Sequence, residues 1–241
     1  MDEFNKFLES QLYPRREKKE VPRPFVTVSR QTGAGGHTFA NMLVGRMAAE
    51  EDPLFWGWRI FDRELCTRVL EDPKIKISLE SLLTEEYRSQ VEDMLFNLLE
   101  DQTPQEIVIK KIFETLITLA SFGNVILIGR GGACVTSRLP GGIHLRLVAP
   151  ETTRVRRMQD LLGIGQQQAK KIVAEQDAAR RQLVKECFGK DIDDPLLYDA
   201  VWNTEKIPMP VIVEMTMEMI KRKAAELKEK FSVSGCRCED R

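Results

Sequence analysis

Short apolar runs alternate along the chain with longer segments whose apolar residues recur at helical spacing. The runs predict strands over residues 25–28, 58–61, 124–128, 143–148 and 200–203. The run at 124–128 is continuous, which is typical of a strand buried on both faces of a parallel sheet. Strands that alternate with helices in this way indicate an α/β fold with a parallel β-sheet flanked by helices.

The segments with helical spacing place the helices of this fold. One helical pattern begins at Thr38, directly after a glycine-rich turn. Residues 63–121 have a strongly helical pattern with a break at Pro104, so we predict a helical insertion between strands. Residues 151–190 predict a pair of helices, and residues 211–231 predict a final amphipathic helix.

The pattern divides the chain into an N-terminal arm (residues 1–24), one α/β domain (residues 25–231) and a charged tail (residues 232–241). The arm opens with apolar residues at helical spacing and continues into a charged stretch. Such an arm suits a contact in a homodimer or a brace against the domain, and equally a mobile extension. The sequence leaves these alternatives open.

A glycine-rich turn, Ser29-Arg-Gln-Thr-Gly-Ala-Gly-Gly-His-Thr38, joins the first predicted strand to the first predicted helix. Strand, glycine turn and helix form the local layout of a phosphate-binding loop, because glycines let the backbone approach oxyanions and the helix N-terminus offers unpaired N–H groups. The same glycines would also make a tight turn without a ligand. The residues expected to hold phosphates are Thr32, Gly33, Ala34, Gly35, Gly36, His37 and Thr38.

The turn lacks the cation of the Walker pattern. Gly36 stands at the position where that pattern has lysine. Arg30, just before the glycines, is the candidate to supply the charge, although an arginine at a strand end also suits a surface position. Thr38 suits both the first turn of a helix and a ligand of Mg²⁺, and these two roles are compatible.

The overall charge of the chain is close to zero, so anion sites are expected where arginines cluster locally. The formal net charge is −1, and 30% of the residues are charged, which argues against general binding to nucleic acid or to acidic membranes. No apolar run reaches the ~18 residues needed to span a bilayer, and the chain starts without the apolar core of a signal peptide. We therefore expect a cytoplasmic protein whose anion sites come from clustered side chains.

The predicted strand ends and two predicted helices supply such side chains. Ligands in parallel α/β sheets lie beyond the carboxyl ends of the strands, where Asp62 and Gly129-Arg130 are found. Asp62 suits a place near an acceptor group and also the N-cap of a following helix. The paired helices carry further arginines, which suit either solvated faces or a lid that neutralises a moving phosphoryl group. These arginines are Arg154, Arg156, Arg157, Arg180 and Arg181.

Further motifs follow the glycine turn along the chain. They are Phe61-Asp-Arg-Glu-Leu65, Gly129-Arg130, Arg156-Arg157, Asp177-Ala-Ala-Arg180, and Asp194-Pro195 with the stretch Tyr198 to Thr204. Together with the turn, they resemble the cytidylate kinase-like branch of the nucleoside monophosphate kinases over roughly residues 25–225. The resemblance implies a P-loop-type parallel sheet with a helical acceptor-binding insertion at 63–121 and an arginine-rich helical lid at 151–190.

The resemblance also implies roles for single residues. The acceptor would be held by Arg68, Arg130, Asp177 and Arg180. With Arg30 and Asp62 added from the strand ends, the catalytic set would be Arg30, Asp62, Arg130, Arg156 and Arg157. The chain departs from the family pattern at Gly36, at Gly131 in place of an aspartate, and at Ile128 in place of an acidic residue.

These features together predict a nucleoside monophosphate kinase. It would transfer the γ-phosphoryl group of ATP to CMP or a related pyrimidine monophosphate such as dCMP or UMP, with Mg²⁺ held by Thr38. Two alternatives follow from the departures at Gly36, Ile128 and Gly131. The chain would be a nucleotide-binding sensor or scaffold without turnover, or a kinase for another small acceptor such as a nucleoside or a sugar.

Overall fold

The computed structural model describes residues 21–62 and 104–235, and in these ranges five strands form one sheet. The order is β2-β3-β1-β4-β5, and every neighbouring pair is parallel. The strands are β1 (Phe25–Arg30), β2 (Arg59–Phe61), β3 (Val125–Ile128), β4 (Gly142–Val148) and β5 (Ala200–Asn203). All four residues of β3 are buried, as its continuous apolar run predicted. The predicted α/β class with a parallel sheet is confirmed.

Helices connect these strands. They are α2 (Gly36–Ala48), η1 (Pro53–Phe55), α6 (Pro104–Phe122), α7 (Gly132–Val135), α8 (Glu151–Leu162), α9 (Gln166–Phe188), η2 (Pro195–Leu197) and α10 (Met209–Gly235). Helix α6 begins at Pro104, where the sequence predicted a break, and the rest of the predicted insertion lies outside the described residues. Among the helices of the described part, none has both the length and the apolar character of a membrane span.

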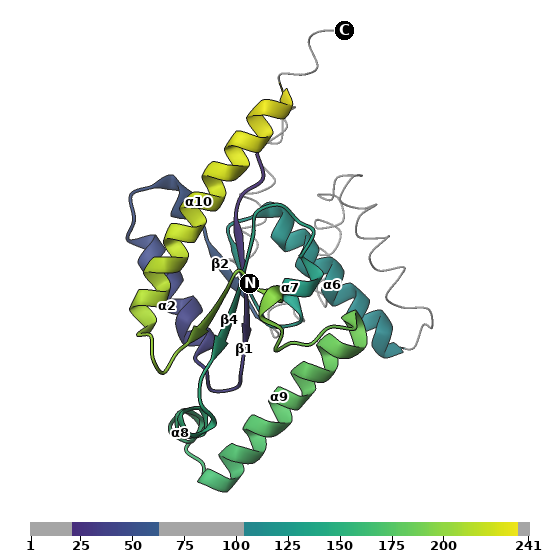
Figure 1. Cartoon of the computed structure of the whole chain (residues 1–241), viewed down its shortest axis with the longest axis vertical. Coiled ribbons are helices and arrows are strands. Elements are labelled where there is room, and N and C mark those ends of the chain that lie inside the picture. Colours follow the sequence, from purple (N-terminus) through teal and green to yellow (C-terminus); the bar gives the residue numbers. More distant parts are fainter. Residues whose placement is uncertain (1–20, 63–103, 236–241) are drawn as a thin grey trace.

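The sheet is covered by helices on both faces (Figure 1). One face of β1 carries Val26 and Val28, which join a core with residues of α2 and α10. The opposite face carries Phe25, which joins a second core built mainly by α6. Successive residues of a strand point to opposite faces, so one short strand anchors both layers.

Strand β1 extends further than its apolar run predicted. The run ends at Val28, but pairing with β4 continues through Ser29 opposite Arg146 and Arg30 opposite Leu147. The polar side chains beyond the run did not predict this extension, which comes from the ladder with β4. As a result, Arg30 belongs to the rigid carboxyl end of the central strand.

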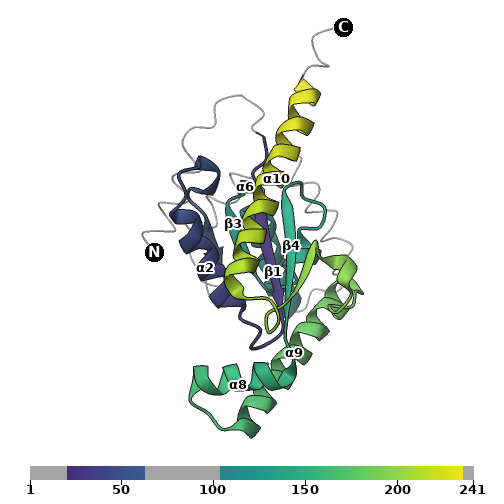
Figure 2. The same ribbon diagram turned by 60° about the vertical axis from the view of Figure 1, so that its left-hand side comes forward.

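The predicted pair of helices forms a hairpin beyond the carboxyl ends of the strands (Figure 2). Gly163 ends α8 in the left-handed conformation with φ 64°, and Gly165 caps α9, so the predicted interruption is confirmed. The two helices share a small apolar core of their own, formed by Val155, Met158, Ala169 and Val173. The hairpin therefore faces the edge of the sheet where a ligand is expected.

Candidate functional site

The glycine turn presents a row of unused backbone donors. Gly33 and Gly35 have φ values of 78° and 89°, a conformation that favours glycine. The Ala34 N–H closes the turn on the Gln31 carbonyl at 3.1 Å. Other backbone N–H groups have no acceptor among the described residues, and these belong to Gly33, Gly35, Gly36, His37 and Thr38. Consecutive N–H groups at the start of a helix form a favourable anion site.

Helix α8 holds the carbonyl side of the same turn. Arg154 is buried and donates from Nη1 to the Thr32 carbonyl at 3.1 Å and from Nε to the Ala149 carbonyl at 2.9 Å. Arg157 donates from Nη1 to the Thr204 hydroxyl at 2.8 Å and from Nη2 to the Thr204 carbonyl at 2.9 Å. A Cβ built on Gly33 would lie 2.5 Å from the Arg154 carbonyl oxygen. The turn is therefore packed on α8, while its N–H groups are left for a ligand.

Asp177 of α9 fastens the turn from another direction. One oxygen, Oδ1, accepts from the Thr32 N–H at 2.7 Å and from its hydroxyl at 2.8 Å. The other oxygen accepts from Arg154 Nη1 at 2.7 Å, and Arg180 donates to Oδ1 at 3.1 Å. Arg180 also donates to the Thr32 hydroxyl. One carboxylate therefore joins the turn, α8 and α9.

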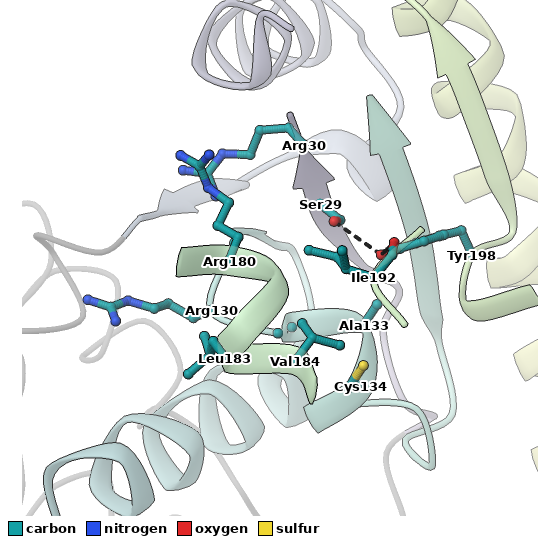
Figure 3. A pocket seen from close by; sticks show the side chains of 13 residues that line it. Ser29, Arg30, Arg130, Ala133, Cys134, Arg180, Leu183, Val184, Ile192 and Tyr198 are labelled. Atoms are coloured by element: carbon teal, nitrogen blue, oxygen red, sulfur yellow. Dashed lines mark hydrogen bonds between the residues drawn. The ribbon is translucent and has the colours of Figure 1, made fainter. Parts of the chain in front are cut away.

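Three arginines gather beside the turn. In Figure 3 the guanidinium groups of Arg30 and Arg180 lie close together, and Arg130 extends to the same side of the pocket. Burial and the neighbouring charge of Arg180 lower the pKa of Arg30 to about 10, and Asp62 partly opposes this effect. Burial also lowers the pKa of Arg180, against the opposing effect of Asp177. Like charges held together in this way favour a bound anion.

These arginines line one end of a pocket of about 380 Å³, including the solvent at its mouth. The other end has apolar walls, contributed by Ala133, Leu183, Val184 and Ile192. Between the two ends, the Tyr198 hydroxyl donates to the Ile192 carbonyl at 2.8 Å and lies 3.2 Å from Ser29 Oγ, with which it is hydrogen-bonded (Figure 3). The pocket therefore has a charged end and an apolar end, a combination that is typical of small-molecule sites.

Arg146 of β4 belongs to this region, although the sequence analysis gave it no role. Its side chain is only 5% exposed, donates to Ser29 Oγ at 2.9 Å and pairs with Asp193. Its guanidinium carbon lies 5.6 Å from the centre of the Tyr198 ring. The signal in the sequence that could have identified Arg146 is the presence of a charged residue within the apolar run of β4. Arg146 fastens the segment before β5 to the centre of the sheet.

The remaining predicted residues lie in different places. Asp62 follows β2, and its Oδ2 lies 3.5 Å from Nε2 of His37, which is 58% exposed. Thr38 is exposed in the first turn of α2. Arg156 is exposed on α8 and makes no hydrogen bond or ion pair with a described residue. Arg68 lies outside the described residues.

Comparison with known proteins shows the relationship directly. The model of the cytidylate kinase-like family matches residues 25–206. The chain belongs to the cytidylate kinase-like family. The match covers the sheet, the turn and the α8–α9 hairpin, and it confirms the resemblance that the motifs indicated. Membership of this family supports a nucleotide kinase in general terms.

A solved structure shows a similar fold at low sequence identity. A protein of uncharacterised function from Eubacterium ventriosum is 17% identical, with a TM-score of 0.63, and the match covers 83% of this chain and 99% of that one. A shikimate kinase from Bacteroides thetaiotaomicron is 12% identical over 87% of this chain and 98% of its own, with a TM-score of 0.42. The second value is too low to support a conclusion.

One curated relative matches part of the chain. A uronate isomerase from Corynebacterium glutamicum is 29% identical over 108 residues, which are 45% of this chain and 21% of that protein. The chain therefore spans about a fifth of the length of this relative. The partial match does not include most of the larger protein, so it carries no statement about activity.

Proposed function

We propose that this protein is a nucleoside monophosphate kinase that transfers the γ-phosphoryl group of ATP to CMP or a related pyrimidine monophosphate. One observation carries the proposal: the turn that holds the unused backbone N–H groups of Gly33 and residues 35–38 contacts Arg30 and Arg180, and these two arginines line a pocket with Arg130. Backbone donors and arginines together suit phosphates, and two adjacent phosphate sites suit a donor and an acceptor. Family membership agrees with this reading.

The reaction needs little covalent help from the protein. An oxygen of the acceptor phosphate forms a bond to the γ-phosphorus, while the bond from that phosphorus to the β–γ bridging oxygen breaks. The bonding electrons stay on the bridging oxygen, which leaves as part of ADP. The attacking phosphate oxygen is already deprotonated near neutral pH, so no general base is required. Catalysis therefore rests on positioning and on neutralising charge.

The residues divide between donor and acceptor in this proposal. The N–H groups of Gly33 and residues 35–38 hold the donor phosphates, and Arg130 and Arg180 hold the acceptor phosphate at the charged end of the pocket. Arg156, which is exposed on α8, is free to turn toward the transferred group when a ligand arrives. Arg157 donates to Thr204 and, at 3.4 Å, to the Gly33 carbonyl, so it supports the turn.

Thr38 fits the part of a Mg²⁺ ligand. Its side chain is exposed in the first turn of α2, beside the N–H groups of the turn, and it makes no hydrogen bond with a described residue. A hydroxyl oxygen together with phosphate oxygens and water is a typical donor set for Mg²⁺. When bound, the ion would neutralise charge on the donor phosphates.

A coupled assay for ADP formation over a panel of nucleoside monophosphates tests the proposal. We expect turnover with CMP, dCMP or UMP, and a loss of kcat/KM of ~10²-fold or more in Arg180→Ala. Arg222→Ala on α10 is the matched control, because that arginine is 80% exposed and, among the described residues, pairs only with Glu218 on its own helix. Its kcat/KM should stay within about twofold. Absence of turnover with every monophosphate would refute the proposal.

A nucleotide-binding sensor is the second candidate. Gly36 at the lysine position and the use of Asp177 in fastening the turn favour it, since both reduce the groups available to the reacting phosphates. Calorimetry with ATP separates the two candidates when it is run beside the turnover assay. If the protein binds ATP but shows no turnover with any nucleoside monophosphate, nucleoside or sugar as acceptor, it is a sensor.

A further inference from the structure

The phosphate-binding turn has exchanged the residue classes at two of its positions. The pattern Gly-x-x-x-x-Gly-Lys begins with glycine and has its cation at the seventh position. When the pattern is aligned on Gly35, its first position is Arg30 and its seventh is Gly36. The cation therefore stands first and the small residue seventh, so the turn has the same two kinds of residue in reversed places.

The structure shows why the two positions are linked. A Cβ built on Gly36 would lie 3.0 Å from Cγ and 3.3 Å from Cδ of Arg30. Real Cβ atoms rarely approach other heavy atoms so closely, and Gly36 is buried. The aliphatic part of Arg30 therefore crosses the start of α2, in the space that a lysine at position 36 would need. The two positions share one space.

The charged end of Arg30 lies against a third glycine. Gly129, at the end of β3, has a φ of 79°, and a Cβ there would overlap Nη1 of Arg30. The Arg30 guanidinium makes no hydrogen bond or ion pair with any described residue, whereas Arg154, Arg157 and Arg180 each donate to protein oxygens. Arg30 is thus held in position by its stem while its donors remain available.

We infer that Arg30 replaces the Walker lysine and contacts the β- and γ-phosphate oxygens of the bound nucleotide. This inference rests on the proposed function. Negative charge increases on the β–γ bridging oxygen as its bond to the γ-phosphorus breaks, and Arg30 neutralises it without giving up a proton. Gly36 and Gly129 are small because the arginine passes over the first and ends on the second.

A double-mutant cycle between positions 30 and 36 tests the inference. Arg30→Met keeps most of the stem and removes the charge, and Gly36→Lys introduces the cation of the usual pattern. We expect Arg30→Met to weaken ATP binding at least tenfold in calorimetry without an acceptor, and to lower kcat/KM by ~10²-fold. Gly36→Lys alone should also weaken ATP binding, because the new side chain displaces Arg30.

The decisive protein combines Arg30→Ala with Gly36→Lys. Removing the stem frees the shared space, so Gly36→Lys should tighten ATP binding in the Arg30→Ala background, although it weakens binding in the unmodified chain. The effect of Gly36→Lys on ATP affinity would then have opposite signs in the two backgrounds. This distinguishes two side chains that compete for one space from two independent effects. Tighter ATP binding by Gly36→Lys in the unmodified chain, or unchanged binding by Arg30→Met, would overturn the inference.

The two proposals fail in different ways. If the unmodified chain binds ATP but phosphorylates no acceptor, the proposed kinase function is wrong, and the binding cycle still decides the role of Arg30. If turnover is present and Arg30→Met leaves it unchanged, the kinase function holds and the inference is wrong. Urea midpoints of the unmodified chain and of every variant serve as the folding control. Arg30→Lys, which keeps a charge, should recover part of the ATP affinity that Arg30→Met loses.

Discussion

At the scale of single residues, Asp177 connects more of the site than any one motif suggested. Its carboxylate accepts from the backbone and hydroxyl of Thr32 and from the guanidinium groups of Arg154 and Arg180. The side chain of Asp177 is 17% exposed and that of Arg154 is 9% exposed. An arginine so buried depends on its partner, since an uncompensated buried charge is strongly unfavourable.

Asp177→Asn should therefore lower the free energy of unfolding by roughly 2–4 kcal/mol, because the neutral amide no longer compensates Arg154 and Arg180. Urea denaturation measures this change. The control is Glu175→Gln on the same helix, whose ion pair with Lys171 spans 3.8 Å between side chains that are 63% and 74% exposed. That variant should change stability by less than about 0.5 kcal/mol. Equal effects of the two would contradict the role given to Asp177.

His144 should make the fold sensitive to acid. Burial lowers its pKa, and Lys223 acts in the same direction while Asp199 opposes them; its Nδ1 lies 2.8 Å from the Thr27 hydroxyl. Below pH ~6.5 the unfolded chain takes up a proton at this position more readily than the folded protein, so stability decreases with falling pH. Urea midpoints between pH 7.5 and pH 5 should show a smaller decrease in His144→Gln. An identical decrease would assign the effect to other groups.

At the scale of elements, the turn between β1 and α2 is fixed by its contacts with α8 as much as by its own glycines. Gly33 has a left-handed φ, and its Cα faces the backbone of Arg154 at a distance that leaves no room for a side chain. Gly163, between α8 and α9, has a similar φ of 64° but open space around it. Substitutions at the two positions can therefore be compared to separate the cost of backbone strain from the cost of steric contact.

Gly163→Ala should cost about 1 kcal/mol of stability, which is the strain of a left-handed alanine. Gly33→Ala should cost about 2 kcal/mol more and should abolish ATP binding, because the added methyl group pushes the turn away from α8. Thermal unfolding and calorimetry measure the two effects. Similar losses in both variants would mean that the packing of the turn on α8 contributes little.

The elements were largely predictable from periodicity, whereas their contacts were not. The apolar run of β3 and the glycine break between α8 and α9 gave correct predictions. Helix α7 has only four residues, too few for a helical period, and was missed. Arg154 was grouped with other arginines of a charged helix, because a pattern shows which residues share a face but not what covers it. Its partner Thr32 lies 122 positions away in the sequence.

At the scale of the whole molecule, the site joins parts that are far apart in the chain. The turn comes from the first quarter, the arginine at the end of β3 from the middle, and the hairpin α8–α9 from the second half. Figures 1 and 2 show this hairpin at the end of the sheet toward which the strands point. A ligand that binds at this junction would stabilise the folded protein relative to the unfolded chain.

ATP at a hundred times its dissociation constant should therefore raise the free energy of unfolding by about 2.7 kcal/mol, in one cooperative transition. Adenosine at the same concentration is the control, because it lacks the phosphates that the turn and the arginines are expected to hold. Thermal unfolding with both compounds provides the measurement. A similar shift with adenosine would show that the base, rather than the phosphates, is the main contact.

The shared space of Arg30 and Gly36 restricts how this family can diverge. Replacing only Gly36 by lysine puts two long cations where one fits, and replacing only Arg30 by glycine leaves the turn without a cation. Each single step between the two arrangements passes through an impaired protein. Relatives should therefore fall into two groups. One group has a long residue at the position of Arg30 and glycine at the position of Gly36, and the other has glycine at the first of these positions and a long cation at the second. Relatives with two glycines or two long residues at these positions should be rare.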